Sequence, residues 1–279
     1  MTVLWMLLLG CAGREGCDDR EVYDHDAQRC VPYSPGDPVA ADVWVPPVGT
    51  TWQWQLSGRI DTSYDVAMYD IDLSETPDAT LAALGDRTVI CYFSAGSVED
   101  FRDDIGFIDD VAIGAKLDGW PDERWLDVSH PDAFELARRR LDLAVERGCD
   151  GVEPDNVDAY VNGSGFPLSA AEQLQFNRFL ADEAHSRGLS VGLKNDVDQL
   201  DDLLPWFDWA LNEECVSYDE CGRYRGFRDA DKAVFHTEYV DAQGEAKAMA
   251  AEICPARPAW FSTLVKTWDL GPERTTCDD

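Results

Sequence analysis

The chain has 279 residues, of which 45% are hydrophobic and 11% aromatic, so it can bury a full core and is not expected to be disordered. Its 55 acidic and 23 basic residues give a formal net charge of -32. A field of this sign repels nucleic acid and argues against any polyanionic partner, whereas a cationic polymer would be attracted. Such acidity is equally typical of highly soluble or salt-adapted proteins.

Residues 1–11 form a short apolar run that ends at a cysteine. The run is too short to span a bilayer. Its last residues, Leu8-Leu9-Gly10-Cys11, have the form of a bacterial lipobox, although the positive residues that usually open a signal peptide are missing. We therefore expect a protein exported to the bacterial cell envelope or beyond, with a lipid on Cys11 as its membrane link.

Residues 12–47 are polar and interrupted by prolines, which is typical of an extended tether. Cys17 and Cys30 bracket a small polar loop and are expected to form a disulfide there. The compact domain is predicted to follow over residues 48–279.

Without Cys11, eight cysteines remain, an even number that suits an oxidising compartment. Cys215–Cys221 is a short-range pair, and Cys254–Cys277 could fasten the C-terminus. Cys91 and Cys149 lie in or beside predicted strands and are expected to be reduced, buried thiols. The chain has four histidines and no CxxC motif, so no zinc site is predicted, and no cofactor motif such as GxGxxG or a P-loop is present.

From Thr50 onward, strand-like and helix-like patterns alternate. The predicted strands are Thr51–Leu56, Asp65–Asp72, Thr88–Ser94, Asp150–Asp155, Ser190–Asn195, Trp209–Glu213, Ala233–Tyr239 and Trp260–Lys266. The predicted helices are Pro77–Leu84, Pro131–Arg147, Ser169–Arg187, Val197–Leu204 and Gly244–Ile253. Eight strands in this alternation favour an α/β fold of the (β/α)8 TIM-barrel type, with a doubly wound open sheet as the alternative.

The segment between Ser94 and Asp150 is long and contains Trp120 and Trp125. It is interpreted as an extended loop after the third strand. In a barrel this loop lies on the catalytic face, so the two tryptophans either form a wall of a sugar subsite or pack in the core.

The segment from Glu153 to Asp158 carries the strongest functional signal. In a strand, alternate side chains share a face, so Glu153 and Asp155 point the same way, and Pro154 ends the strand near this point. Asn156 and Asp158 follow directly. Two carboxylates at the mouth of a sheet are typical of a carbohydrate-cleaving site, although a solvated acidic loop or a calcium site would also fit.

A second carboxylate is expected from the sixth strand. Trp209, Leu211 and Glu213 share one face of that strand, so if Trp209 points into the barrel, Glu213 does too. Glu214 would then face outward, in packing or helix capping. Glycosidases need one group to protonate the leaving oxygen and one carboxylate on the opposite side of the sugar, and Asp155 with Glu213 could flank one sugar in this way.

Nine short motifs occur in a fixed order along the chain and resemble those of glycoside hydrolase family 114, the endo-α-1,4-polygalactosaminidase-like barrels. The motifs are MYDIDL, CYFSAGS, LDGWP, ERWLDV, DGVEPDNVDAY, GLKND, LNEEC, YDEC and HTEY. The resemblance covers roughly residues 44 to 277.

The resemblance implies hydrolysis of internal α-1,4 linkages in a partly cationic galactosamine polymer. We separately expect a monomer that uses no metal or cofactor. The resemblance also implies that Asp155 is the nucleophile and Glu213 the acid/base, with the stereochemical outcome left open. The residues expected to line sugar subsites are Asp61, Asp70, Tyr92, Glu153, Asn156, Asp158, Lys194 and Glu238. A non-catalytic carbohydrate-binding barrel and an α-glycosidase for a neutral polymer are the alternatives.

Overall fold

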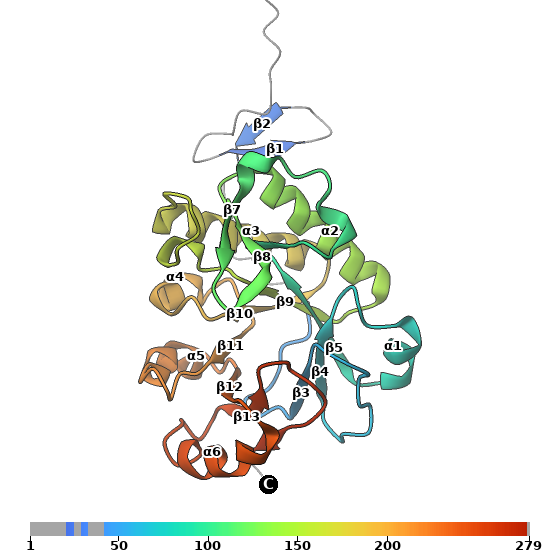
Figure 1. The fold of residues 1–279 in the computed structure, drawn as a ribbon, viewed down its shortest axis with the longest axis vertical. Coiled ribbons are helices and arrows are strands. Elements are labelled where there is room, and N and C mark those ends of the chain that lie inside the picture. Colours follow the sequence, from blue (N-terminus) through green and yellow to red (C-terminus); the bar gives the residue numbers. More distant parts are fainter. Residues whose placement is uncertain (1–20, 25–28, 33–41, 278–279) are drawn as a thin grey trace, which may run out of the picture.

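The computed structural model describes residues 21–24, 29–32 and 42–277 (Figure 1). Cys11 and Cys17 lie outside these residues, and so do the predicted lipid attachment and the predicted N-terminal disulfide. Within residues 21–32, strands β1 (Glu21–Asp24) and β2 (Arg29–Pro32) pair in antiparallel fashion.

A curled nine-stranded sheet forms the centre of the molecule, and all eight predicted strands belong to it. These eight are parallel to one another, and a short ninth strand, β14, pairs antiparallel with β13. In spatial order they are β3 (Trp52–Gln55), β4 (Met68–Asp72), β5 (Thr88–Ser94), β9 (Gly151–Asp155), β10 (Ser190–Lys194), β11 (Trp209–Glu213), β12 (Val234–Val240), β13 (Ser262–Thr267) and β14 (Thr275–Thr276).

The two ends of the parallel series approach each other. The indole Nε1 of Trp52 in β3 donates a hydrogen bond to the carbonyl of Ser262 in β13, at 3.1 Å. The Trp52 ring also lies 4.9 Å from the ring of Phe235 in β12. The sheet therefore curls back on itself in a mixed α/β fold that is consistent with a TIM-like barrel.

Helices connect most of the parallel strands and cover the outside of the sheet (Figure 1). They are α1 (Asp78–Leu84), α2 (Pro131–Arg147), α3 (Ala170–Ser186), α4 (Leu200–Leu203), α5 (Arg225–Asp229) and α6 (Ala246–Ile253). The predicted helix starts are confirmed, because α2 begins at Pro131 and the Ser169 side chain caps α3 in a capping box with Glu172. No described helix is long and apolar enough to cross a membrane.

Alternate residues of the strands belong to two separate cores. One large cluster lies between the sheet and its helices, and it includes Ile71, Val152 and Leu193. A second cluster lies on the opposite, inner face and contains Trp52, Trp54, Met68, Ile90, Trp209, Leu211 and Phe235. Trp209 thus points inward, which is the condition under which Glu213 shares the inward face of its strand.

Gly192 makes room for this inner packing. A Cβ atom on Gly192 would meet the Trp209 ring at 2.3 Å, so a larger residue in β10 would displace the indole. The Trp209 Nε1 atom then reaches the Ser190 hydroxyl at 3.0 Å, which satisfies the buried indole donor.

The segment after β5 differs from the prediction of an extended loop. It folds into a three-stranded antiparallel sheet of β6 (Ser97–Glu99), β7 (Ile113–Leu117) and β8 (Trp120–Leu126), in the order β6-β8-β7. Trp125 is buried against Leu117 and Ala159, whereas Trp120 at the start of β8 is 50% exposed. The alternation in this segment is weak because β7 and β8 pair with a register irregularity.

Three disulfides occur among the described residues. Cys215–Cys221 and Cys254–Cys277 confirm the two predicted pairs. The prediction that Cys91 and Cys149 are free thiols is wrong, because they form a third disulfide. Cys91 lies within β5 on its outer face, and Cys149 precedes the neighbouring strand β9, so the two Cα atoms lie 6.0 Å apart.

Candidate active site

A cavity of about 870 Å³ opens at the carboxyl ends of the parallel strands. Thirteen acidic and four basic residues line it, so its charge follows that of the whole chain. The aromatic residues of its wall are Trp54, Tyr92, Phe101, Trp120, Trp125, Tyr160, Tyr218, Tyr239 and Trp268. Carboxylates set among aromatic rings are the usual composition of a saccharide site.

The buried ammonium group of Lys194 lies at the centre of the site. Its Nζ atom is 3.1 Å from Glu153 Oε1, 3.1 Å from Asp155 Oδ1 and 3.3 Å from Glu213 Oε2. The ammonium also lies 4.8 Å from the centre of the Trp54 ring. These three carboxylates raise the pKa of Lys194 well above its usual value even though burial opposes the shift, so Lys194 is a permanent cation.

Hydrogen bonds hold Asp155 at the end of β9. Asp155 Oδ2 accepts from the Tyr92 hydroxyl at 3.2 Å, and Asp155 Oδ1 accepts from the backbone N–H of Asn156 at 2.8 Å. Asn156 has a left-handed backbone with φ of 60°, and its side chain donates to Ser94 Oγ at 2.8 Å. The chain therefore turns sharply after Asp155 and leaves its carboxylate at the cavity wall.

Glu213, at the end of β11, is held by a matching set of donors. Its Oε1 accepts from the Tyr239 hydroxyl, and its Oε2 accepts from Asn195 Nδ2 at 2.9 Å. The Tyr239 ring is itself stacked on Trp268, with ring centres 4.2 Å apart. Glu213 is thus held by Tyr239 from β12 and by Asn195 from the loop after β10, and Trp268 packs against Tyr239.

Asp70 and Glu153 form a second layer beneath the pair, and both are fully buried. Burial raises the pKa of Glu153 to about 7, although Lys194 opposes the shift. Burial and the neighbouring charge of Glu153 raise the pKa of Asp70 well above its usual value. Asp70 and Glu153 are therefore two buried carboxyl groups that both hold their protons more tightly than exposed carboxyl groups do.

Two further carboxyl groups lie near Asp155 in the cavity wall. Burial and the charges of Glu99 and Asp155 raise the pKa of Glu123 to about 7. Burial and Asp155 raise the pKa of Asp158 to about 6. Glu123 comes from β8, in the antiparallel insertion, and accepts from Ser97 Oγ at 3.0 Å. The site thus has several carboxyl groups that titrate close to neutral pH.

Most of the predicted site residues lie together. Six of them line the cavity: Tyr92, Asp155, Asn156, Asp158, Lys194 and Glu213. Asp70 and Glu153 lie directly beneath. The remaining two are not brought to the cavity. Asp61 accepts from the backbone N–H of Ser63 in the loop after β3, and Glu238 is fully buried on the far side of β12.

Strand alternation explains why Tyr239, and not Glu238, reaches Glu213. Phe235 and Tyr239 both belong to the inner cluster, so the residues between them at even positions, His236 and Glu238, face the other way. The alternation that predicts an inward Glu213 on β11 also predicts an inward Tyr239 on β12, so this residue could have been found from the sequence.

Glu214 departs from the alternation that the sequence suggested. It was expected to face outward, but it lines the cavity next to Glu213. Its backbone is left-handed, with φ of 63°, so the strand pattern ends at Glu213 and the next side chain turns back toward the opening. A left-handed residue cannot be identified from the residue type glutamate, and no sequence signal marked it.

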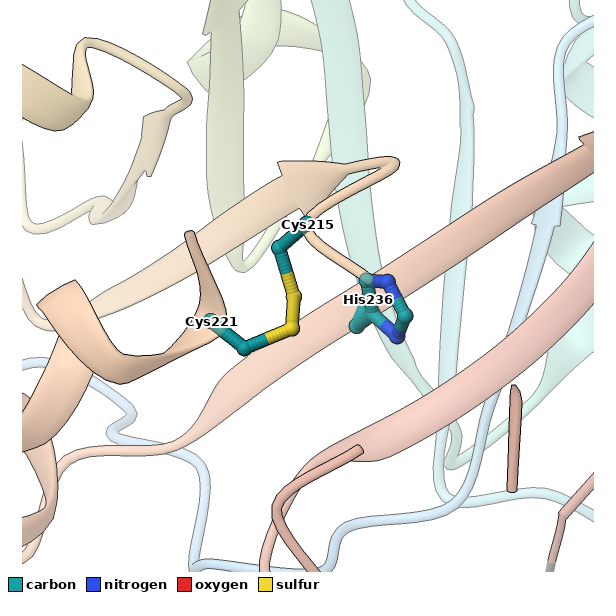
Figure 2. Close-up of side chains that lie close together, drawn as sticks. All are labelled: Cys215, Cys221 and His236. Carbon is teal, nitrogen blue, oxygen red and sulfur yellow. A yellow bond between two sulfur atoms is a disulfide. The ribbon is translucent and has the colours of Figure 1, made fainter. Parts of the chain in front are cut away.

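Two groups of residues contain atoms that can ligate metals, and the contacts of each group argue against a metal site. Cys215, Cys221 and His236 place their ligand atoms within 4.8 Å of one another (Figure 2), but the two sulfur atoms are joined in a disulfide and are not thiolates. The two His236 nitrogens are already hydrogen-bonded: Nδ1 lies 3.1 Å from Thr263 Oγ1, and Nε2 lies 3.1 Å from Glu238 Oε1. The other group, Asp70, Asp72 and Asp155, is divided because Arg102 pairs with Asp72 at 2.6 Å.

The geometry suits attack on a glycosidic bond. Asp155 Oδ1 and Glu213 Oε2 both lie within 3.3 Å of the Lys194 nitrogen, so these oxygens are separated by less than twice that distance. They come from two strands that β10 separates. A sugar ring above Lys194 could therefore meet one carboxylate on each side.

The sequence model of glycoside hydrolase family GH114 matches residues 35–279. The crystal structure of Aspergillus fumigatus Ega3 in complex with galactosamine is similar, with 40% sequence identity, a TM-score of 0.81, and coverage of 87% of this chain and 100% of that one. The glycoside hydrolase domain of PelA from Pseudomonas aeruginosa shares the fold at 14% identity, with a TM-score of 0.62 and coverage of 83% and 99%. No curated protein sequence gives a significant match.

Proposed function

The chain belongs to glycoside hydrolase family GH114, and we propose that it cleaves internal α-1,4 linkages in a galactosamine-containing, partly cationic polysaccharide. The observation that carries the proposal is the pair Asp155 and Glu213, which share the Lys194 ammonium in an acidic, aromatic cavity. We take the scaffold to be a closed (β/α)8 barrel, which the contact between β3 and β13 supports.

In the proposed mechanism Asp155 is the nucleophile and Glu213 the acid/base. Glu213 protonates the departing oxygen while an Asp155 oxygen attacks the anomeric carbon, and Glu213 then takes a proton from the water that hydrolyses the glycosyl-enzyme. The separation of the two carboxyl groups sets the stereochemical outcome, because groups about 5 Å apart retain the configuration whereas inversion needs about 6.5–9.5 Å. Lys194 and Tyr92 hold the two oxygens of Asp155 in place at the cavity wall.

A galactosamine polymer suits the charge of the cavity. The similar structure of Ega3 contains galactosamine, and in this chain the acidic residues outnumber the basic ones by more than three to one along the wall. Each exposed pair between an ammonium and a carboxylate contributes at most about 1 kcal/mol. A preference for a cationic over a neutral polymer would therefore need several such pairs. A neutral polymer would not gain this contribution.

We also propose that the protein acts as an exported monomer. The three disulfides support an oxidising compartment, and the lipobox-like segment supports lipid attachment at Cys11. Metabolic labelling with a palmitate analogue, compared between the full chain and a Cys11→Ala variant, tests the lipid.

Release of reducing ends from deacetylated galactosaminan tests the activity. Asp155→Asn and Glu213→Gln should each lower turnover by about 1000-fold or more, because each removes a group required in the transition state. Asp86→Asn and Glu252→Gln are matched controls, since both residues are exposed and lie outside the catalytic cavity. Native turnover in both site variants would refute the mechanism. Binding without any reducing ends from the wild type would instead favour the non-catalytic alternative.

A further inference from the structure

Exposed apolar side chains gather around the catalytic cavity. Nine large hydrophobic side chains are exposed among the described residues, and five of them line this one cavity. These five are Phe101, Trp120, Val161, Tyr218 and Trp268. Scattered single exposed residues need no explanation, but a concentration around one opening indicates a binding surface.

Tyr218 is the most exposed of the five, at 68%. It lies in the loop that follows the acid/base residue, between Cys215 and Cys221. Trp268 stacks on Tyr239 and Phe101 lies under Arg102, whereas the Tyr218 ring stacks on no other ring in the described part of the chain. Most of the Tyr218 side chain is thus open to a ligand.

The loop that carries Tyr218 is firmly anchored. The Cys215–Cys221 disulfide closes its base (Figure 2). The buried carboxylate of Glu238 accepts from the backbone N–H of Val216 at 2.8 Å and from the hydroxyl of Ser217 at 2.6 Å. Glu238 is itself held by His236 at 3.1 Å.

A rigid loop with an exposed aromatic ring binds at a low entropic cost, because the ring is already in place before the ligand arrives. The neighbouring polar groups indicate which ligand it suits. Glu214 and Glu220 line the same cavity, and Glu220 Oε1 accepts from Asn212 Nδ2 at 3.3 Å. An aromatic face flanked by carboxylates matches a sugar ring, whose C–H face is apolar, with an amino group at its edge.

We propose that Tyr218 is a platform for a sugar ring of the polymer in a subsite beside the cleaved bond, and that Glu238 and the Cys215–Cys221 disulfide position it. This inference depends on the proposed function for the identity of the polymer. It gives Glu238 a role that differs from the sugar contact expected from the sequence. Glu238 acts through the loop as a positioning residue.

The first experiment compares Tyr218→Ala, Tyr218→Leu and Tyr218→Phe on long deacetylated galactosaminan. The KM of the Ala and Leu variants should rise about three- to tenfold with a smaller change in kcat, because a stacking contact is lost while the catalytic pair is retained. The Phe variant keeps the ring face and should recover most of the affinity. Val111→Ala is the control, because Val111 is 69% exposed and lies outside the cavity.

The second experiment tests positioning with a double-mutant cycle. Cys215→Ser/Cys221→Ser and Glu238→Gln should each raise the polymer KM, but neither should add to the effect of Tyr218→Ala, because all three changes remove the same platform. Thermal unfolding of every variant identifies those that are folded at the assay temperature. Fully additive effects would overturn the positioning role.

A binding measurement keeps this inference separate from the proposed function. Affinity for deacetylated oligosaccharides is measured in the Asp155→Asn background, with and without Tyr218→Ala. A wild-type affinity for the Tyr218→Ala variant overturns the platform even if the wild-type enzyme cleaves the polymer. Weaker binding without any cleavage by the wild type supports the platform and overturns the proposed hydrolysis.

Discussion

The inner face of the sheet has two regions that obey the same alternation but serve opposite purposes. At the amino ends of the strands, Trp52, Trp209 and Phe235 pack into a dry aromatic floor, with ring centres 4.9 and 5.3 Å apart. At the carboxyl ends, Lys194 and Glu213 continue the same inward face into the charged mouth. One strand, β11, runs from Trp209 through Leu211 to Glu213 and so spans both regions.

The two regions contribute to folding stability in opposite ways. Burying apolar side chains in the floor stabilises the protein, at about 25 cal/mol per Å² removed from water. Burying Lys194 with three carboxylates costs desolvation energy, which the attraction between these groups must offset. Floor variants should therefore alter stability alone, and mouth variants should alter catalysis as well.

Replacing Lys194 should give the largest effect of this kind. Lys194→Met leaves three neighbouring carboxylates without a cation, so the free energy of unfolding should fall by about 3–5 kcal/mol and kcat by about 100-fold or more. Leu211→Ala, one layer below the mouth, should lower stability by about 2–5 kcal/mol while kcat stays near the wild-type value. Denaturant unfolding and initial rates measure the two quantities.

Lys194→Arg is a second variant that keeps the charge. It should retain most of the stability but lower kcat, because the larger guanidinium displaces Asp155 and Glu213. A Lys194→Met variant with native kcat would break the proposed division between floor and mouth.

The Cys91–Cys149 disulfide lies on the outer side of the sheet, so its removal should lower stability without changing catalysis, as for the aromatic floor. It closes a segment with a sequence separation of 58, so Cys91→Ala/Cys149→Ala should lower stability by about 2–5 kcal/mol, chiefly through the unfolded chain. The turnover of the folded variant should not change. A loss of turnover at a temperature where the variant is fully folded would show that the two sides of β5 are coupled.

The pH dependence of stability should give the smallest effect. Below about pH 7 its direction should come from Glu123 and Glu153, whereas the lowered pKa of Lys266, about 7, acts above that range. The folded protein raises the pKa of Glu123 and Glu153 to about 7, so these groups keep protons that the unfolded chain releases above about pH 4.5. The free energy of unfolding should therefore fall as pH rises from about 4.5 to about 7. The lowered pKa of Glu238 acts in a separate, more acidic range.

Melting temperatures at pH 5 and pH 8 test this dependence. Glu123→Gln removes one of the titrating groups and should reduce the difference by about 1–3 °C. Asp86→Asn should leave the difference as in the wild type. A protein that is more stable at pH 8 than at pH 5 would contradict the assignment.

Local patterns predicted most of the scaffold. The eight parallel strands lie within two or three residues of their predicted bounds because each is a short apolar run between helix signals. The antiparallel strands β6–β8 were missed because their residues show no clean alternation, and their pairing is irregular. The Cys91–Cys149 bond was missed because it joins positions that only the pairing of β5 with β9 brings together.

Residue order was enough to predict which carboxylates share a face with Trp209 or with Gly151, because side-chain direction alternates along a strand. The packing of different strands placed Lys194 against three of them at once, buried Asp70 so that its pKa is raised, and turned Glu214 into the cavity. These outcomes depend on distances between different strands and on local burial. Neither quantity is encoded in the order of residues along one strand.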